Sequence, residues 1–210
     1  MTGLVDQILL KSPAPVLTDT EITLLLWGST PHRQHGLVKR ALARGDLVRV
    51  RRGLYCLGER FRKRPVHAFE LANRIYGPSY VSFQSALSYH GWIPEAVHTT
   101  TSASAKRSRE FETPFGVFSF IHTPPLLAMT GVEREQRDGA VFLVASPWKA
   151  LLDYVFAFKK NWTSLDPVEK DLRVDRELLQ EFDLDEIKEM SAPYRNKRID
   201  RFIAGLSKDY

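Results

Sequence analysis

The 210-residue sequence contains a single cysteine, Cys56, and only three methionines. One cysteine cannot form an internal disulfide or a multi-cysteine metal site, and its place in an apolar segment predicts a small buried side chain. No apolar run approaches the roughly 18 residues of a membrane span, and the N-terminus lacks the pattern of a secretory signal peptide. These absences predict a cytoplasmic protein with no membrane partner.

The motifs of common catalytic sites are also missing, because the sequence holds no G-x-S-x-G, no P-loop and no G-x-G-x-x-G. His32 and His35 have a spacing that could present two imidazoles to one metal ion, but no third ligand is evident. Ser85, His90 and Asp153 are the residue types of a nucleophilic triad, yet their spacing does not predict that they meet. We therefore expect no catalytic residues, no bound metal and no cofactor.

The positive charge is concentrated in the first third of the chain. Residues 1–64 hold 12 Lys/Arg against 5 Asp/Glu, a net charge of +7, whereas residues 65–210 hold 18 against 20, a net charge of −2. A basic module followed by a nearly neutral one predicts a polyanion-binding domain joined to a domain with another role.

Three helices are predicted in the basic module. An apolar side marks the first over residues 3–11, and Thr18 and Glu21 have the spacing of a capping box for the second, over residues 19–27. The third begins at Ser29-Thr30-Pro31, where a hydroxyl can cap the helix and proline suits the first helical position, and it runs to about Arg44.

The segment after the third helix predicts a hairpin. Gly45 suits a left-handed helix cap, and β-branched, aromatic and aliphatic residues then lie on both sides of Arg51-Arg52-Gly53. A basic helix followed by an arginine-loaded two-stranded ribbon is the layout of a winged helix-turn-helix, which we predict over residues 1–64.

The third helix is predicted to read DNA, because an apolar stripe occupies one of its faces and basic residues lie at the edge of that stripe and across from it. The first part of such a helix reads base edges, and the ribbon reaches phosphates or a minor groove. The predicted DNA-binding residues are His32, Arg33, Gln34, His35, Lys39, Arg40 and Arg44 on the helix and Arg49, Arg51 and Arg52 on the ribbon.

Residues 65–210 are predicted to form a second, mixed α/β domain after a charged linker at residues 59–67, so the fold class is α+β. Strand composition marks residues 99–102, 115–122 and 141–145. Ser82 is expected to cap one helix, and Ser146-Pro147 to open another that reaches about residue 158. Residues 161–175 are expected to be irregular, followed by helices near residues 177–182, 185–190 and 194–206.

Four segments together resemble a known family: LVRVRRGLYCL (47–57), YVSFQSALSYHGW (80–92), TPFGVFSFIHTP (113–124) and VASPWKALLDYV (144–155). In order and spacing they are similar to the AbiEi-type antitoxins of bacterial type IV toxin–antitoxin (abortive infection) systems. The resemblance implies an N-terminal winged helix that binds inverted repeats in its own promoter. It also implies a C-terminal domain that counteracts a nucleotidyltransferase-like toxin.

The chain is not expected to be the toxin itself, because no Asp-x-Asp pair follows Gly28-Ser29 within a dozen or so residues. Two other interpretations stay open. One is a stand-alone winged-helix regulator whose second domain dimerises or senses a ligand. The other is a nucleic-acid-modifying enzyme with a DNA-binding appendage.

Overall fold

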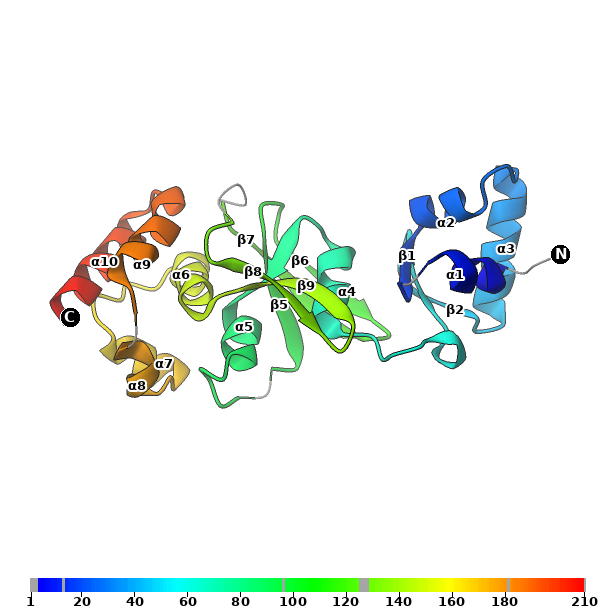
Figure 1. Cartoon of the computed structure of the whole chain (residues 1–210). Helices are drawn as coiled ribbons and strands as arrows, with labels where there is room; N and C mark the ends of the chain where they lie inside the picture. Colours follow the sequence, from blue (N-terminus) through cyan, green and yellow to red (C-terminus); the bar gives the residue numbers. More distant parts are fainter. Residues whose placement is uncertain (1–3, 13, 96, 125–128, 181, 210) are drawn as a thin grey trace.

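The first and last helices of the chain lie at opposite ends of the molecule, with two β-sheets between them (Figure 1). The computed structural model describes residues 4–12, 14–95, 97–124, 129–180 and 182–209. Within these residues, a first unit has a three-stranded sheet with helices, and a second unit has a six-stranded sheet with further helices. The fold is therefore α+β, as the sequence predicts.

The first unit follows the order helix, strand, helix, helix, strand, strand: α1 (Leu4–Lys11), β1 (Val16–Thr18), α2 (Asp19–Leu25), α3 (Pro31–Ala43), β2 (Leu47–Arg51) and β3 (Leu54–Leu57). Its sheet has the order β1-β3-β2, and both neighbouring pairs are antiparallel. The sequence did not predict β1, because three residues are too few for a periodic signal. Its pairing with β3 places Val16 opposite Cys56, which is free and buried as expected.

Local hydrogen bonds fix the helix starts in this unit. The backbone N–H of Glu21 donates to the Thr18 hydroxyl at 3.2 Å, and the N–H of Thr18 donates to the Glu21 carboxylate at 2.6 Å. This reciprocal arrangement is the predicted capping box, and it satisfies two amides that a helix start leaves without partners.

The second unit follows a short 3-10 turn, η1 (Glu59–Phe61). Its six-stranded sheet has the order β6-β7-β5-β4-β9-β8, with parallel pairing for β4–β9 and β5–β7. The elements are α4 (Ala68–Ile75), β4 (Ser79–Val81), α5 (Phe83–Tyr89), β5 (Thr99–Ser104), β6 (Arg109–Thr113), β7 (Gly116–His122), β8 (Val132–Arg137), β9 (Ala140–Ala145), α6 (Pro147–Ala157), α7 (Asp166–Leu172), α8 (Arg176–Gln180), α9 (Leu184–Ser191), η2 (Ala192–Tyr194) and α10 (Lys197–Asp209).

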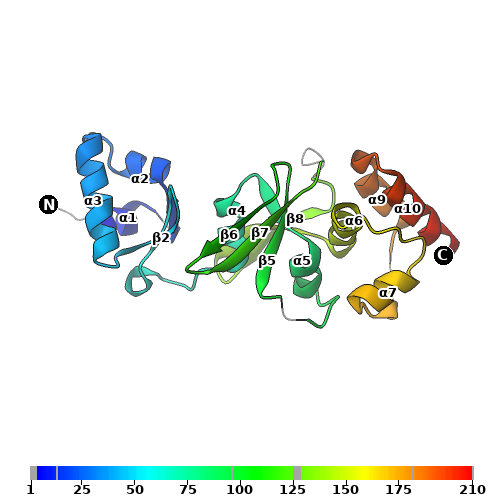
Figure 2. The same cartoon turned by 180° about the vertical axis from the view of Figure 1, so that it is seen from behind.

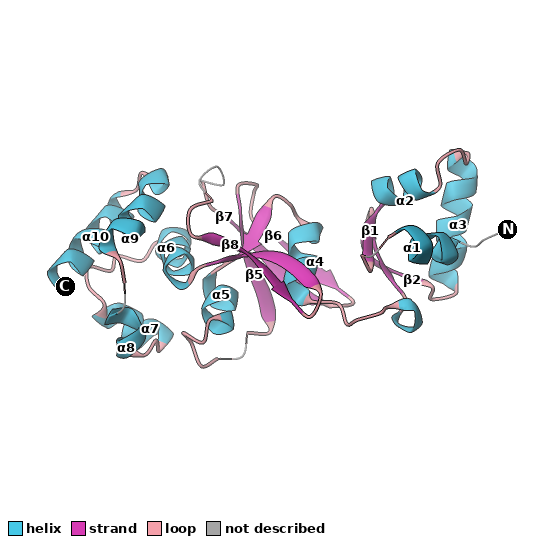
Figure 3. Cartoon of the chain, in the orientation of Figure 1, coloured by secondary structure: helices cyan, strands magenta, loops and turns pink. Residues whose placement is uncertain are grey.

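The sheet lies in the middle of the molecule, in magenta in Figure 3. At the α4 face, Phe69 packs edge-on against Phe142 of β9, with ring centroids 5.4 Å apart. The helix α5 packs along β5 and against α6. The last helices, α9 and α10, pack against α6 at the end of the molecule farthest from the first unit (Figure 2).

Three features of the second unit differ from the sequence prediction. The strands β6 and β8 were not predicted, because they form the two edges of the sheet and carry charged side chains that hide a strand pattern. Residues 161–175 were expected to be irregular, which is wrong for α7. That helix buries only Val168 and Leu172, an apolar pattern too brief to be recognised.

A buried polar network lies where α6 meets β4 and the C-terminal segment. Lys149 donates to Asp153 at 3.1 Å and to the hydroxyl of Tyr194, and Tyr80 and Tyr194 both donate to the same carboxylate. Ser82 occupies the N-cap position of α5, as predicted, but its hydroxyl makes no capping hydrogen bond and instead donates to Asp153 at 2.6 Å. A buried carboxylate is stable only with several hydrogen-bond donors, so the Ser82 hydroxyl bonds to Asp153 and not to the backbone at the start of α5.

The two units share a continuous apolar core, to which the first unit contributes Val16, Val50, Leu54 and Cys56. The segment predicted as a linker is itself anchored, because Arg64 within it donates to Glu70 of α4 at 2.7 Å. The first sheet is therefore packed against the second unit.

Candidate nucleic-acid interface

Local structure at both ends of α3 fixes where the helix begins and ends. The hydroxyl of Thr30 accepts a hydrogen bond from the N–H of Arg33 at 3.4 Å, and Pro31 occupies the first helical position, as predicted. Gly45 follows the C-terminal end with a φ of +70°. Between these ends the buried Ala41 and the partly buried Leu37 pack into the core of the first unit. The opposite side of α3 is thereby turned to solvent.

The predicted residues of α3 differ in their exposure and in their contacts. Gln34 is half-buried, and its side-chain amide donates to the backbone oxygen of Ser29 at 3.1 Å. The guanidinium of Arg40 folds back toward Gly36, where a Cβ would lie 3.3 Å from it. Of the predicted residues on the helix and at its C-terminal end, the exposed ones are His32, Arg33, His35, Lys39, Arg40 and Arg44.

Arg44 is engaged at the end of the helix. It donates to Asp46 at 2.9 Å, and Arg60 pairs with the other oxygen of the same carboxylate. Burial works to raise the pKa of Asp46, but the hydrogen bonds from Arg60 and Arg44 outweigh it and lower the pKa. Two guanidinium groups thus share one carboxylate, and the group keeps a net positive charge.

The hairpin forms as predicted, with Gly53 at a φ of +77° in its turn. The carbonyl of Gly53 accepts a hydrogen bond from the N–H of Asp19 at 3.1 Å, which ties the turn to the start of α2. Arg52 is exposed beside it, and the guanidinium of Arg49 lies 6.0 Å from the ring centre of Tyr55. The turn is therefore held by backbone bonds, while Arg52 extends into solvent.

Arg51 lies apart from the other two arginines of the hairpin. Its Nε donates to the backbone oxygen of Ile75 at 2.7 Å, and Nη1 donates to the oxygen of Arg52, also at 2.7 Å. The register of β2 against β3 shifts between Arg49 and Arg51, and such a bulge re-aims the side chain that follows it. Arg51 thus contacts the second unit, whereas Arg49 faces α3.

A hollow of about 530 Å³ separates α3 from the hairpin. Of the predicted residues, the structure brings Gln34, His35, Arg49 and Arg52 to this hollow. Lys39, Arg40 and Arg44 do not line it. The full lining consists of Asp19, Ile22, Thr23, Pro31, Gln34, His35, Val38, Arg49, Arg52 and Tyr55.

Tyr55 belongs to this site although the sequence did not mark it. It lies directly opposite Arg49 in the hairpin register, so strand pairing was the signal that could have identified it. Burial raises the pKa of the Tyr55 hydroxyl, and the nearby charge of Asp19, to which it is hydrogen-bonded, raises the pKa further. The neutral phenol thus interacts with both Asp19 and Arg49, which line the hollow with it.

The three residue types of a nucleophilic triad have separate partners. His90 Nε2 lies 2.9 Å from the backbone oxygen of Ala145, and Ser85 donates to the backbone oxygen of Thr99 at 3.3 Å. Asp153 belongs to the network around Lys149. Among the described residues, no three His, Cys, Asp or Glu side chains gather as a metal site would require.

None of the described helices has the length and apolar character that a membrane crossing requires. A scan against protein-family models matches none to this chain, and a search of curated proteins yields no significant match.

Proposed function

We propose that the protein is a cytoplasmic, DNA-binding transcription regulator, and more narrowly an antitoxin of the AbiEi type that represses its own operon. In this proposal the first unit is a winged helix-turn-helix. The helices α2 and α3 form the helix-turn-helix and the β2–β3 hairpin is the wing. The order of elements in this unit and the position of the hairpin beside α3 support the proposal.

The observation that carries the proposal is the hollow between α3 and the hairpin. Gln34 and His35 face it from the helix, and Arg49 and Arg52 face it from the hairpin. A helix in the major groove and a ribbon over the neighbouring backbone would approach a duplex from these two sides. Residues at the start of α3 would then contact base edges, and the arginines would contact phosphates or a minor groove.

The roles of the predicted residues divide according to their contacts. His32, Arg33, Gln34 and His35 are proposed to read bases, and Lys39 and Arg40 to contact phosphates. Arg44 shares Asp46 with Arg60 and is proposed as a weaker phosphate contact. Arg51 bonds to Ile75 and is proposed to hold the hairpin rather than DNA.

Fluorescence anisotropy with duplex DNA from upstream of the operon tests the DNA-binding proposal. With about five phosphates engaged, the log-log slope of affinity against salt should be about −4 to −5. Binding should be tighter to a duplex with inverted repeats than to a shuffled duplex of equal composition. Salt-insensitive binding, or equal affinity for both duplexes, would contradict specific DNA recognition.

The second unit is proposed to counteract a nucleotidyltransferase-like toxin, a proposal that rests on the family resemblance. Co-expression with the adjacent gene tests it directly. The full chain should restore growth when that gene is toxic. Replacing Lys39 and Arg40 by alanine should release repression and leave the rescue intact. A non-toxic neighbouring gene, or no rescue, would contradict the antitoxin role.

A second candidate is a stand-alone regulator whose second unit senses a small ligand. A cavity of about 540 Å³ in the second unit favours it, because this volume is within the range of small-molecule sites. If the neighbouring gene is harmless but operator DNA is bound, this candidate is preferred over the antitoxin.

A further inference from the structure

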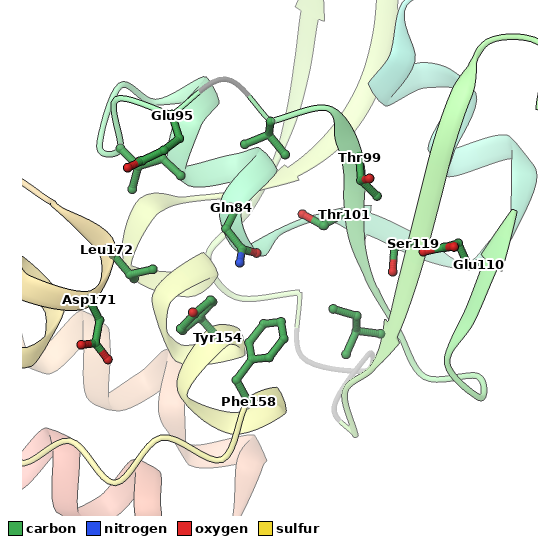
Figure 4. A pocket seen from close by; sticks show the side chains of 13 residues that line it. Gln84, Glu95, Thr99, Thr101, Glu110, Ser119, Tyr154, Phe158, Asp171 and Leu172 are labelled. Atoms are coloured by element: carbon green, nitrogen blue, oxygen red, sulfur yellow. The ribbon is translucent and has the colours of Figure 1, made fainter. Parts of the chain in front are cut away.

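The cavity of the second unit lies between one face of the six-stranded sheet and residues of α5, α6 and α7. Successive residues of a strand point to opposite faces of a sheet. On β7, Phe120 packs against Tyr76 next to α4, with ring centroids 5.3 Å apart, whereas Ser119 and Ile121 line the cavity on the other face. Figure 4 shows Gln84 of α5 and Phe158, at the end of α6, on the opposite side of the cavity.

The polar lining of the cavity includes two hydrogen-bond acceptors without partners among the described residues. Gln84 Oε1 is buried and has no hydrogen-bond partner among the described residues. Glu110 on β6 also lines the cavity, and no ion pair to its carboxylate occurs within the part of the chain that the structure describes. Both groups are acceptors, so a ligand that satisfies them must supply N–H or O–H donors.

The other two carboxylates at the cavity are already neutralised. Arg173 donates to Glu95 at 2.8 Å, and Lys160 donates to Asp171 at 3.0 Å. No lysine, arginine or histidine is among the described lining residues. The cavity thus carries one uncompensated negative charge and, among its described lining residues, no positively charged side chain, which disfavours phosphates and carboxylates as ligands.

The aromatic wall is suited to a positive charge. The ring of Phe158 is 42% exposed and lies 4.5 Å from the ring of Tyr154, centroid to centroid. The ammonium of Lys160 already lies 5.7 Å from the Tyr154 ring centre, so this wall holds one cation in the structure. Aromatic faces attract cations at such distances. Ile93 and Leu172 add apolar surface for the body of a ligand.

We propose that this cavity is a binding site for a small organic cation, namely a protonated amine or guanidinium carried on a short aliphatic chain. The charged end pairs with Glu110 and donates to Gln84, and the aliphatic part lies against Phe158 and Ile93. This inference concerns the second unit alone and does not depend on whether the first unit binds DNA.

Isothermal titration calorimetry of the full-length chain with agmatine tests the proposal, and N,N′-diacetylputrescine serves as an uncharged probe of similar length. Agmatine should bind saturably with one site per chain, and the diacetylated probe should bind at least about tenfold more weakly, a difference of about 1.4 kcal/mol. Absence of saturable agmatine binding, or equal affinity for the two probes, would overturn the proposal.

Variants locate the site. Glu110→Gln should weaken agmatine binding about threefold to fivefold, because the Glu110 carboxylate is exposed and water partly screens an ion pair with it. Gln84→Leu should weaken it as well. Glu133→Gln, an exposed glutamate on β8 that does not line the cavity, is the matched control and should bind like the unmodified chain. Equal weakening in Glu133→Gln and Glu110→Gln would show diffuse charge attraction and would overturn the assignment of this cavity.

Discussion

Arg51 Nε donates a hydrogen bond to the backbone oxygen of Ile75 across 2.7 Å and so attaches the hairpin to the C-terminal end of α4. The neighbouring Arg74 pairs with Glu21 at the start of α2. The end of α4 is therefore bonded to two elements of the first unit. The last carbonyls of a helix have no hydrogen-bond partner within the helix. Arg51 therefore also satisfies the backbone oxygen of Ile75, which would otherwise stay unpaired.

The two adjacent arginines of the hairpin are predicted to separate stability from DNA binding. Arg51→Ala should lower the free energy of unfolding by about 1 to 2 kcal/mol, because it removes charge-assisted hydrogen bonds in a partly buried position. Arg52→Ala should change it by less than about 0.5 kcal/mol, because the side chain is exposed. Urea unfolding of both variants checks the difference.

For DNA binding the order of the two variants is expected to be reversed, with Arg52→Ala weakening affinity more than Arg51→Ala. Arg52→Ala should reduce the magnitude of the log-log salt slope by about one and weaken binding on all sequences alike if the residue contacts a phosphate. A larger loss on A/T-rich flanks would place it in a minor groove. Unchanged affinity of Arg52→Ala would contradict a role for the hairpin as a wing.

Gly53→Ala is predicted to strain the hairpin turn. The residue has a φ of +77°, and an added Cβ would lie 3.2 Å from the carboxylate of Asp19. We expect a loss of about 1 to 3 kcal/mol in the free energy of unfolding, measured by urea denaturation. Gly36→Ala is the control, because Gly36 lies within α3 and its Cβ would meet only the movable end of Arg40. That change should leave stability equal or raise it by up to about 1 kcal/mol.

Lys149→Met is predicted to be among the most destabilising single changes in the second unit. The side chains of Lys149 and Asp153 are 1% and 0% exposed, so removal of the cation leaves a carboxylate buried without its charge partner. The expected loss is about 3 to 5 kcal/mol in the free energy of unfolding. Lys188→Met breaks an exposed pair with Asp185 and should cost less than about 1 kcal/mol. Similar losses in the two variants would contradict this reading of the buried network.

The capping box is predicted to make stability depend on pH in the acid range. Burial alone would raise the pKa of Glu21, but hydrogen bonds from the Thr18 backbone, from Arg74 and from the Thr18 hydroxyl outweigh it and lower the pKa. A carboxylate whose pKa is lowered by folding stabilises the fold above its unfolded pKa. That stabilisation is lost as the pH falls through the folded-state value.

Glu21→Gln should therefore be less stable than the unmodified chain at pH 7, and the difference should shrink as the pH falls below about 4. Thermal unfolding between pH 3 and pH 7 measures it. Glu189→Gln, at an exposed position of α9, is the control and should give a nearly constant difference. A Glu21→Gln difference that does not change with pH would contradict the role of the ionised carboxylate.

The helices and the hairpin of the first unit could be predicted because their signals are local. Thr18 and Glu21 bond to each other over three residues, and Thr30 caps α3 over the same distance. Gly53 supplies the positive φ of the turn on its own. Each signal is contained within one turn of chain, so it can be read without knowing what packs against it. The exposed face of α3 follows from the helical period in the same way.

Other features depended on residues far apart in the sequence. A register shift in β2 and the position of α4 direct Arg51 to Ile75, 24 residues away. The hydroxyl of Ser82 donates to Asp153, 71 residues away, in place of the local hydrogen bond that would cap α5. The edge strands β6 and β8 are held by pairing with neighbours and not by an apolar pattern of their own.

The sequence by itself thus determined the local elements, their caps and the concentration of positive charge in the first unit. Only the tertiary structure decided which arginines of the hairpin face α3 and which hydroxyls serve a buried carboxylate. It also decided where the second unit leaves a cavity. The physical reason is range: caps and turns are satisfied within a few residues, whereas buried charges and cavities are defined by whichever distant segments pack around them.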